Sequence, residues 1–227
     1  MRELTKIKYW IFDLDNTLYS GQTKVFSEVD KKMSSFISDK FNVDLIEAKK
    51  IQKEYFYEYG TTLSGLMKKR NVDPNEFLEF VHDIDLSFLK EDKQLDGEIE
   101  KIEGKKIIFT NGSLAHAKNV TKRLGIERHF DDIFDIVSAD FIPKPSKATY
   151  KKIIEKYKIE PQYRIFIEDI ARNLKPAHEL GMKTVWIIND EPWAAEFSNS
   201  SFINYKTDKL SKFLKEINES RWTGKDN

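Results

Sequence analysis

The sequence contains no cysteine, which excludes disulfides, thiol catalysis and thiolate metal sites. It has four scattered histidines, so the expected metal ligands are oxygen atoms. Neither charge is in excess, because 38 basic residues balance 38 acidic ones, and this gives no overall attraction to nucleic acid or an acidic membrane. No run of about 18 apolar residues could span a bilayer, and the N-terminal apolar run is shorter than a secretory signal requires. We therefore expect a cytoplasmic protein that binds neither a nucleic-acid polymer nor a membrane.

Short apolar segments alternate with helical patterns along most of the chain. Near-continuous apolar runs at 7–12, 106–109, 133–137, 164–167 and 184–188 predict strands buried on both faces, as in a parallel sheet covered by helices. Helical patterns cover 114–124, 147–157 and 172–180, and glycines follow the first and the last of them. This alternation predicts βαβ units and an α/β fold with a doubly wound, Rossmann-like parallel sheet.

The region between about residues 25 and 95 has no strand pattern and differs from the rest of the chain. It predicts helices at 25–41, 45–59 and 75–82, the last opened by Asp73 and Pro74. We therefore expect a helical cap domain of residues 21–95, inserted after the first strand into a core domain of residues 1–20 and 96–227. The alternative is a set of extra helices packed on the core. The tail after residue 219 is expected to be frayed.

Polar residues follow the predicted strands, at the edge where ligands bind in an open parallel sheet. Converging carboxylates repel one another unless a cation lies among them, and an all-oxygen set suits Mg²⁺. Amides at a strand–helix junction beside a lysine suit phosphate oxygens. Together these features predict metal-assisted phosphoryl transfer. The residues concerned are Asp13, Asp15, Thr110, Asn111, Gly112, Lys144, Glu168 and Asp169.

Four motifs, in this order over residues 7–190, resemble the haloacid dehalogenase (HAD) superfamily in its phosphatase branch. "DLDNT" resembles the D-x-D-x-T motif, "IIFTNG" the second motif, Lys144 in "KPSKATY" the third, and "FIEDIARN" the acidic fourth. "DNTLY", "YGTTLSGL" and "FVHDID" further resemble the pyrimidine 5′-nucleotidase-like subgroup. Members of that subgroup are regarded as nucleoside monophosphate phosphatases with a helical cap after the first strand.

The resemblance implies a role for each acidic residue. Asp13 would be the nucleophile that forms an aspartyl-phosphate. Asp15 would protonate the leaving oxygen and then activate water. Mg²⁺ would be held by Asp13, the Asp15 backbone carbonyl and Asp169. Glu168 would be either a further ligand or a partner that positions water.

The second and third motifs supply the expected phosphate site. Thr110 and the amides near Asn111 and Gly112 would bind phosphate oxygens, and Lys144 would neutralise charge on Asp13 and on the transferring group. Lys147 is the alternative lysine. We assign none of the four histidines to metal, and we expect packing roles for those at positions 116 and 178.

The segment "YGTTLSGL" is the candidate for recognising the leaving group of the substrate. Glycines bracket the hydroxyls of Thr61 and Thr62, so that the backbone at Gly60 could approach a ligand while the hydroxyls hydrogen-bond a base. Tyr59 or Phe56 would stack on that base, although packing within the cap is the alternative for both rings.

We expect a Mg²⁺-dependent phosphatase for a small phosphate monoester, with a pyrimidine nucleoside 5′-monophosphate as the preferred substrate. The alternatives are a phosphatase or phosphomutase for another small metabolite, such as a sugar phosphate or phosphoglycolate, and a non-catalytic phosphate-binding module. The sequence leaves the base preference and the oligomeric state open.

Overall fold

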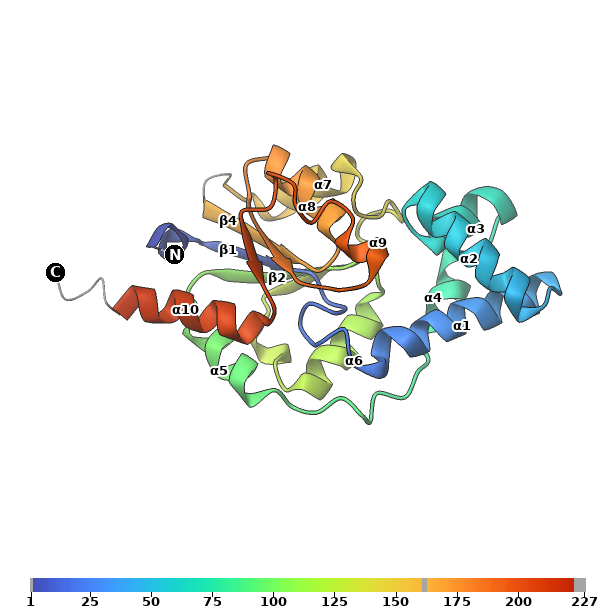
Figure 1. Cartoon of the computed structure of the whole chain (residues 1–227), viewed down its shortest axis with the longest axis horizontal. Helices are drawn as coiled ribbons and strands as arrows, with labels where there is room; N and C mark the ends of the chain where they lie inside the picture. The colour runs from blue at the N-terminus through green and yellow to red at the C-terminus, as the bar shows by residue number, and fades with distance from the viewer. Residues whose placement is uncertain (1, 161–162, 223–227) are drawn as a thin grey trace.

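A computed structural model of the chain describes residues 2–160 and 163–222 (Figure 1). Its centre is a parallel sheet of six strands in the order β3-β2-β1-β4-β5-β6. β1 lies between β2 and β4, and its Tyr9 is in register with Lys105 on one side and Arg164 on the other. The strand order therefore reverses at β1, which is where an open α/β sheet binds its ligand. The strands are β1 Tyr9–Phe12, β2 Lys105–Phe109, β3 Asp132–Phe134, β4 Arg164–Glu168, β5 Lys183–Ile187 and β6 Tyr205–Thr207.

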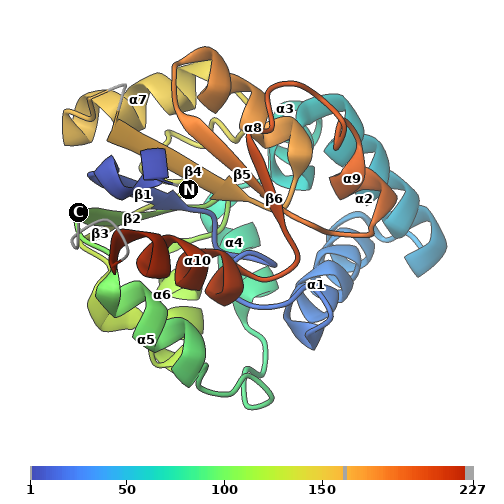
Figure 2. The ribbon, with the colours of Figure 1, turned by 60° about the vertical axis from the view of Figure 1, so that its left-hand side comes forward.

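Helices cover both faces of the sheet (Figure 2). Alternate residues of β1 face opposite layers: Trp10 and Phe12 pack with α5, α6 and α10, whereas Ile11 packs with α7 and α8. α6 begins where the N-cap Ser113 accepts a hydrogen bond from the backbone of His116. The helices are α5 Lys93–Lys101, α6 Leu114–Leu124, α7 Lys147–Tyr157, α8 Ala171–Glu179, α9 Pro192–Ala195 and α10 Leu210–Trp222, with short 3-10 helices at Arg2–Lys6 and Glu127–His129.

Of the five helices between β1 and β2, the first four lie to one side of the sheet (Figure 1). They have a hydrophobic cluster of their own, centred on Phe36, Leu66 and Phe77. Two of them begin at an aspartate that caps the first turn, Asp44 for α2 and Asp73 for α4. Their bounds are α1 Lys24–Phe41, α2 Leu45–Tyr59, α3 Thr62–Arg70 and α4 Pro74–His82.

The predicted α/β fold is confirmed, with differences at several elements. The third strand ends at Phe134 rather than at 137, because the next residue, Asp135, accepts hydrogen bonds from the backbones of Leu114 and Ser138 in a turn. The sequence patterns missed β6, α3, α5, α9 and α10. The tail expected to fray after residue 219 is helical as far as Trp222, and residues 223–227 lie outside the described part.

The expected domain boundary at residues 95 and 96 falls inside α5, which packs against α10 on the core. None of the described helices combines the length and the apolar character needed to cross a bilayer.

Candidate active site

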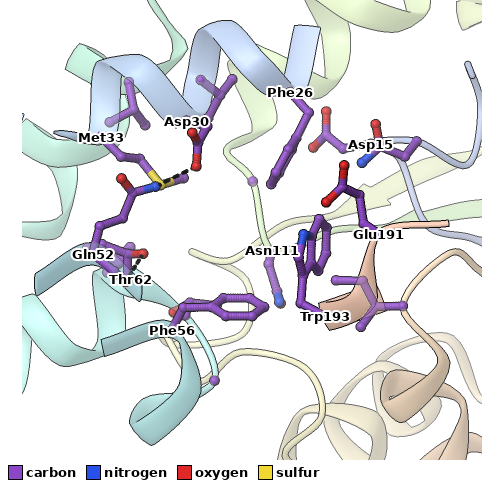
Figure 3. Close-up of a pocket in the computed structure, with 18 of the residues that line it drawn as sticks. Asp15, Phe26, Asp30, Met33, Gln52, Phe56, Thr62, Asn111, Glu191 and Trp193 are labelled. Carbon is purple, nitrogen blue, oxygen red and sulfur yellow. Dashed lines mark hydrogen bonds between the residues drawn. The ribbon is translucent and has the colours of Figure 1, made fainter. Parts of the chain in front are cut away.

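A cavity of about 530 Å³ separates the inserted helices from the carboxyl ends of the strands. Its core side includes Asp15, Asn111 and Lys144, and its other side includes Phe56 of α2 and Phe26 of α1 (Figure 3). The size lies within the range of small-molecule sites in proteins. The cavity therefore lies between Asp15, Asn111 and Lys144 and a surface of the inserted helices, while Asp13, Glu168 and Asp169 are outside its lining.

An ion pair between Asp13 and Lys144 lies at the end of β1. Lys144 Nζ donates to Asp13 Oδ1 at 2.6 Å, to Glu168 Oε2 at 2.7 Å and to the Phe109 carbonyl at 2.9 Å, so all three of its protons are used. Thr17 donates to the second oxygen of Asp13 at 3.1 Å. Burial alone would lower the pKa of Lys144, but the two carboxylates outweigh it and raise that pKa above its usual value.

Carboxylates from β1 and the end of β4 crowd together. Oxygens of Asp13, Glu168 and Asp169 lie within 4.8 Å of one another, and all three side chains are buried. Burial, and then the charge of Glu168, raises the pKa of Asp13 to about 7. Burial and the same neighbour also raise the pKa of Asp169, although Asn189 donates to it at 2.8 Å. One lysine does not balance three carboxylates, and this buried all-oxygen set fits a divalent cation such as Mg²⁺.

The turn after β2 lies beside this cluster, but some of its groups are already engaged. The Gly112 amide donates to Thr110 Oγ1 at 2.9 Å, and Asn111 Oδ1 accepts from the Lys144 backbone at 2.9 Å. Asn111 and Gly112 line the cavity, whereas Thr110 is buried behind it. The Asn111 side chain thus holds the Lys144 loop in place. The alternative lysine, Lys147, is exposed.

Asp15 is turned away from the carboxylate cluster and toward two histidines, neither of which was predicted to belong to the site. His116 Nε2 donates to Asp15 Oδ1 at 2.8 Å, and Tyr19 donates to the same oxygen at 2.5 Å. The ring of His82, the last residue of α4, stacks on His116 with 4.3 Å between centroids. Burial by itself would raise the pKa of Asp15, but His116 and Tyr19 outweigh it and lower that pKa to about 2. The available signal was the place of His116, in the first turn of the helix that follows β2.

The hydroxyls of "YGTTLSGL" contact the protein itself. Thr61 Oγ1 caps α3 by accepting from the Ser64 backbone at 3.1 Å, and Thr62 Oγ1 donates to the Gln52 carbonyl at 3.1 Å. Both residues line the cavity, as does Gly60, which has φ +85° and lies against the Lys144 loop. The Thr61 hydroxyl thus caps α3, and the Thr62 hydroxyl holds α3 to α2.

Tyr59 lies outside the cavity lining, with its ring edge-on to Tyr55. The second glycine of the segment, Gly65, also has a packing role, because a Cβ there would lie 2.3 Å from Tyr55 Cβ. Gly65 therefore allows α3 to approach α2 closely, and no ligand is needed to explain it. Of the two rings proposed to stack on a base, the structure places only Phe56 at the cavity.

An aromatic wall at the cavity consists of Phe26, Phe56 and Trp193, which point toward the same space from α1, α2 and α9 (Figure 3). The Trp193 ring lies 5.6 Å from Phe26 and 5.7 Å from Phe56, centroid to centroid. The guanidinium of Arg172, in the first turn of α8, stacks at 4.5 Å over the Phe56 ring. Arg172 Nε is buried without a hydrogen-bond partner. The wall thus combines flat apolar faces with a cation that has an unused donor.

Comparison with known proteins agrees with this architecture. The model of the haloacid dehalogenase-like hydrolase family matches residues 7–181. Phosphate metabolism protein 8 of Saccharomyces cerevisiae is 30% identical over 235 residues, which cover 93% of this chain and 71% of that protein. Glyceraldehyde 3-phosphate phosphatase of Methanocaldococcus jannaschii is 26% identical over 222 residues, 92% of this chain and 96% of that one.

Solved structures show the same fold at low sequence identity. A haloacid dehalogenase-like hydrolase of Streptococcus pneumoniae superimposes with a TM-score of 0.63 at 17% identity, covering 94% of this chain and 99% of that one. The hydrolase YfnB of Bacillus subtilis, solved with bound magnesium, gives a TM-score of 0.57 at 18% identity, covering 93% and 99%. The likeness includes the inserted helices, because it extends over nearly the whole length of each chain.

Proposed function

Because the chain belongs to the haloacid dehalogenase-like hydrolase family, we propose that it is a Mg²⁺-dependent phosphatase that acts on a small phosphate monoester. The observation that carries this proposal is the pair of aspartates at the end of β1. Asp13 is held by Lys144 among carboxylates, whereas Asp15 is held apart from them by His116. An alkoxide leaving group needs a proton, which a second carboxylate can deliver, whereas a departing halide needs none. The separate environment of Asp15 thus favours phosphate esters over haloacids.

The proposed reaction has two steps. The Asp13 carboxylate attacks phosphorus, the bond to the leaving oxygen breaks, and Asp15 gives that oxygen a proton. Asp15 then takes a proton from water, which attacks the aspartyl-phosphate and releases Asp13 and inorganic phosphate. The pKa of Asp15 is about 2 in the free protein. A bound phosphate places further negative charge beside it, which raises its pKa as the acid role requires.

The carboxylates divide into metal ligands and a partner of the lysine. We infer that Asp13, Asp169 and the backbone carbonyl of Asp15 hold Mg²⁺, which when bound screens the phosphate from the nucleophile. Glu168 accepts from Lys144 at 2.7 Å and from the Ile170 backbone at 3.2 Å. We therefore assign Glu168 to positioning Lys144. Thr110, Asn111, Gly112 and Lys144 would surround the phosphate.

We propose a nucleoside 5′-monophosphate, with a pyrimidine base, as the substrate. The inserted region, residues 21–95, would act as a cap that closes over it. Phe56 and Trp193 offer flat faces on which a base can stack. Arg172 lines the same cavity beside Phe56 and offers its positive charge to a base carbonyl. These three residues take the recognition role that the sequence suggested for Tyr59, Thr61 and Thr62.

A second candidate substrate is a small phosphorylated aldehyde or sugar. The similarity to the glyceraldehyde 3-phosphate phosphatase of M. jannaschii favours it, because the match extends over nearly all of both chains. Such a substrate would leave the aromatic wall largely unused. Substitutions in the wall therefore separate the two candidates.

The test is phosphate release by the purified protein with Mg²⁺ from uridine and cytidine 5′-monophosphates, glyceraldehyde 3-phosphate and 2-phosphoglycolate. Asp13→Asn should abolish release, since it removes the nucleophile. Phe56→Ala and Arg172→Met should raise KM for the nucleotides and leave that for glyceraldehyde 3-phosphate unchanged. The proposed reaction is wrong if no ester is hydrolysed, as expected for a phosphomutase or a binding module. The proposed substrate class is wrong if glyceraldehyde 3-phosphate is hydrolysed fastest.

A further inference from the structure

Two histidines that are distant in the sequence meet next to Asp15. His82 ends α4 in the inserted region, and His116 lies in the first turn of α6 on the core. Their rings are nearly parallel, with an interplanar angle of 12° and centroids 4.3 Å apart. His82 Nδ1 hydrogen-bonds Ser113 Oγ, the N-cap of α6, at 2.9 Å. This pair is a direct polar and aromatic contact between the inserted helices and the start of α6.

The contact from His116 fixes the orientation of the Asp15 carboxylate. His116 and Tyr19 both donate to Oδ1, at 2.8 and 2.5 Å. The carboxylate cannot rotate about its Cβ–Cγ bond without breaking both hydrogen bonds. Asp15 lines the cavity, so this fixed orientation is presented to a bound substrate. Holding a proton donor in one geometry is a large part of its effect on rate.

Packing alone does not explain a histidine at position 116. The side chain is 1% exposed, and its Nδ1 is buried without a hydrogen-bond partner. A buried polar atom without a partner is destabilising, and an apolar side chain of similar volume would avoid that cost. The hydrogen bond from Nε2 to Asp15 is therefore the feature that distinguishes histidine from a packing residue at this position.

Gly112 lies against the stack. A Cβ added there would make ordinary van der Waals contacts, 3.4 Å from His116 Cδ2 and 3.7 Å from His82 Nε2. Burial, followed by the charge of His116, lowers the pKa of His82 to about 3, so its ring stays neutral near pH 7. A neutral ring can stack on its neighbour without charge repulsion.

We propose that His116 is a positioning residue that holds Asp15 for proton transfer to the leaving oxygen, and that His82 makes this arrangement depend on the docking of α4. The proposal rests on the proposed phosphatase function. When α4 is docked, His82 supports the His116 ring, and His116 orients Asp15. When α4 moves away, the His116 ring loses the His82 ring stacked on it, and the hydrogen bond between His82 and Ser113 breaks.

The experiment compares two kinds of ester in the full-length protein with Mg²⁺. One is the fastest alkyl phosphate of the panel above, whose leaving oxygen needs a proton. The other is p-nitrophenyl phosphate, whose leaving anion is stable without one. The measured quantity is kcat/KM, because it reports the steps up to the aspartyl-phosphate and omits its hydrolysis. A fault in proton delivery lowers the ratio of the two values, whereas a general structural fault lowers both equally.

His116→Phe keeps the ring and removes the donor, and His116→Gln keeps a donor and removes the ring. We expect His116→Phe to lower kcat/KM about 10- to 100-fold for the alkyl ester and less than about threefold for the nitrophenyl ester. The larger loss is part of the rate enhancement of about 10²–10⁴ that a positioned acid supplies. His116→Gln should restore part of the ratio. In an Asp15→Asn background, His116→Phe should change either value less than about twofold, because both act on one function.

His82 tests the link to α4. His82→Ala should shift the ratio in the same direction as His116→Phe, whereas His82→Phe, which can still stack, should shift it less. His178→Asn is the matched control, because this histidine is exposed on α8, and it should change neither value. Melting temperatures should show that each variant is folded.

Two results would overturn the proposal. The first is an equal loss, or no loss, on both esters in folded His116→Phe. The second is an undiminished effect of His116→Phe in the Asp15→Asn background. If the wild-type protein hydrolyses neither ester, the phosphatase function itself fails, and the positioning role fails with it. If the wild type hydrolyses the esters but His116→Phe leaves the ratio of the two kcat/KM values unchanged, only the positioning role is wrong.

Discussion

Replacing Lys144 by methionine tests how the charges of the site are held. Lys144 is 2% exposed, and its three protons all have acceptors, two of them carboxylates. Methionine is unbranched and of similar length, so it fills most of the same space and leaves only a small packing fault. The main consequence of the change is the loss of the cation between Asp13 and Glu168.

The expected size follows from this burial. Removing one partner of a buried ion pair costs about 3–5 kcal/mol, because the remaining charge is left uncompensated. Two carboxylates lose their partner here, and the third carboxylate of the cluster, Asp169, adds to the repulsion. A domain has about 5–15 kcal/mol of stability in total. We therefore expect Lys144→Met to remove at least about a fifth of the free energy of unfolding.

The assay is urea unfolding followed by tryptophan fluorescence, with EDTA and again with Mg²⁺. Lys147→Met is the control, because Lys147 is exposed and pairs with Glu179 at the surface. A surface pair of this kind contributes about 0–1 kcal/mol. Magnesium should stabilise Lys144→Met more than the wild type, because the cluster has lost its cation and binds another more tightly. A ligand at 100 times its Kd stabilises by about 2.7 kcal/mol.

The reasoning is refuted if, in EDTA, Lys144→Met unfolds within about 1 kcal/mol of Lys147→Met, since a surface pair is worth no more than that. It is also refuted if magnesium stabilises the wild type and Lys144→Met equally. Equal stabilisation would mean that the lysine and the metal do not share the Asp13 carboxylate.

Two further predictions concern stability. Between pH 6.5 and about 3 the unfolded chain binds a proton at His82 that the folded protein does not, so the free energy of unfolding falls as the pH drops. The slope is about 1.4 kcal/mol per pH unit. Between pH 6.5 and 5, the free energy of unfolding of His82→Phe, measured by urea titration, should therefore fall by up to about 2 kcal/mol less than that of the wild type. Parallel pH profiles of the two proteins would contradict this. Gly65→Ala should destabilise by about 1–3 kcal/mol because of its clash with Tyr55. Gly97→Ala, in α5 with no atom within 4 Å of the added Cβ, should stabilise by about 0.5–1 kcal/mol; thermal melts that rank the two glycine variants the other way would contradict this packing.

The sheet and the groups at its edge could be predicted because their causes are local. An apolar run of four or five residues forms a buried strand wherever it lies, and parallel strands bring their carboxyl ends to one edge. Asp13 and Asp169 follow such runs directly or after one residue, so their meeting follows from the pattern. β6 and α10 were missed because their apolar patterns are short or mixed with charge.

The aromatic wall could not be predicted in this way. Trp193 and Phe26 are far apart in the sequence but in contact in the structure. The pattern around each residue predicts only that one side of its segment is apolar. Their contact depends on how α1 docks against the loop after β5. The same holds for Tyr59, which was predicted to contact the substrate. In the structure its ring packs against Tyr55, because the packing of the helices decides which face of α2 is covered.

The sequence by itself determined the α/β sheet, the order of the motifs and the oxygen-rich edge, because strand formation and strand direction depend on residues that are neighbours in the chain. Only the tertiary structure decided that Lys144 rather than Lys147 meets Asp13, and that His116 and His82 meet Asp15. These contacts depend on the relative placement of separate helices and loops, which is set by the sum of many weak packing interactions. No single sequence motif encodes all of these interactions.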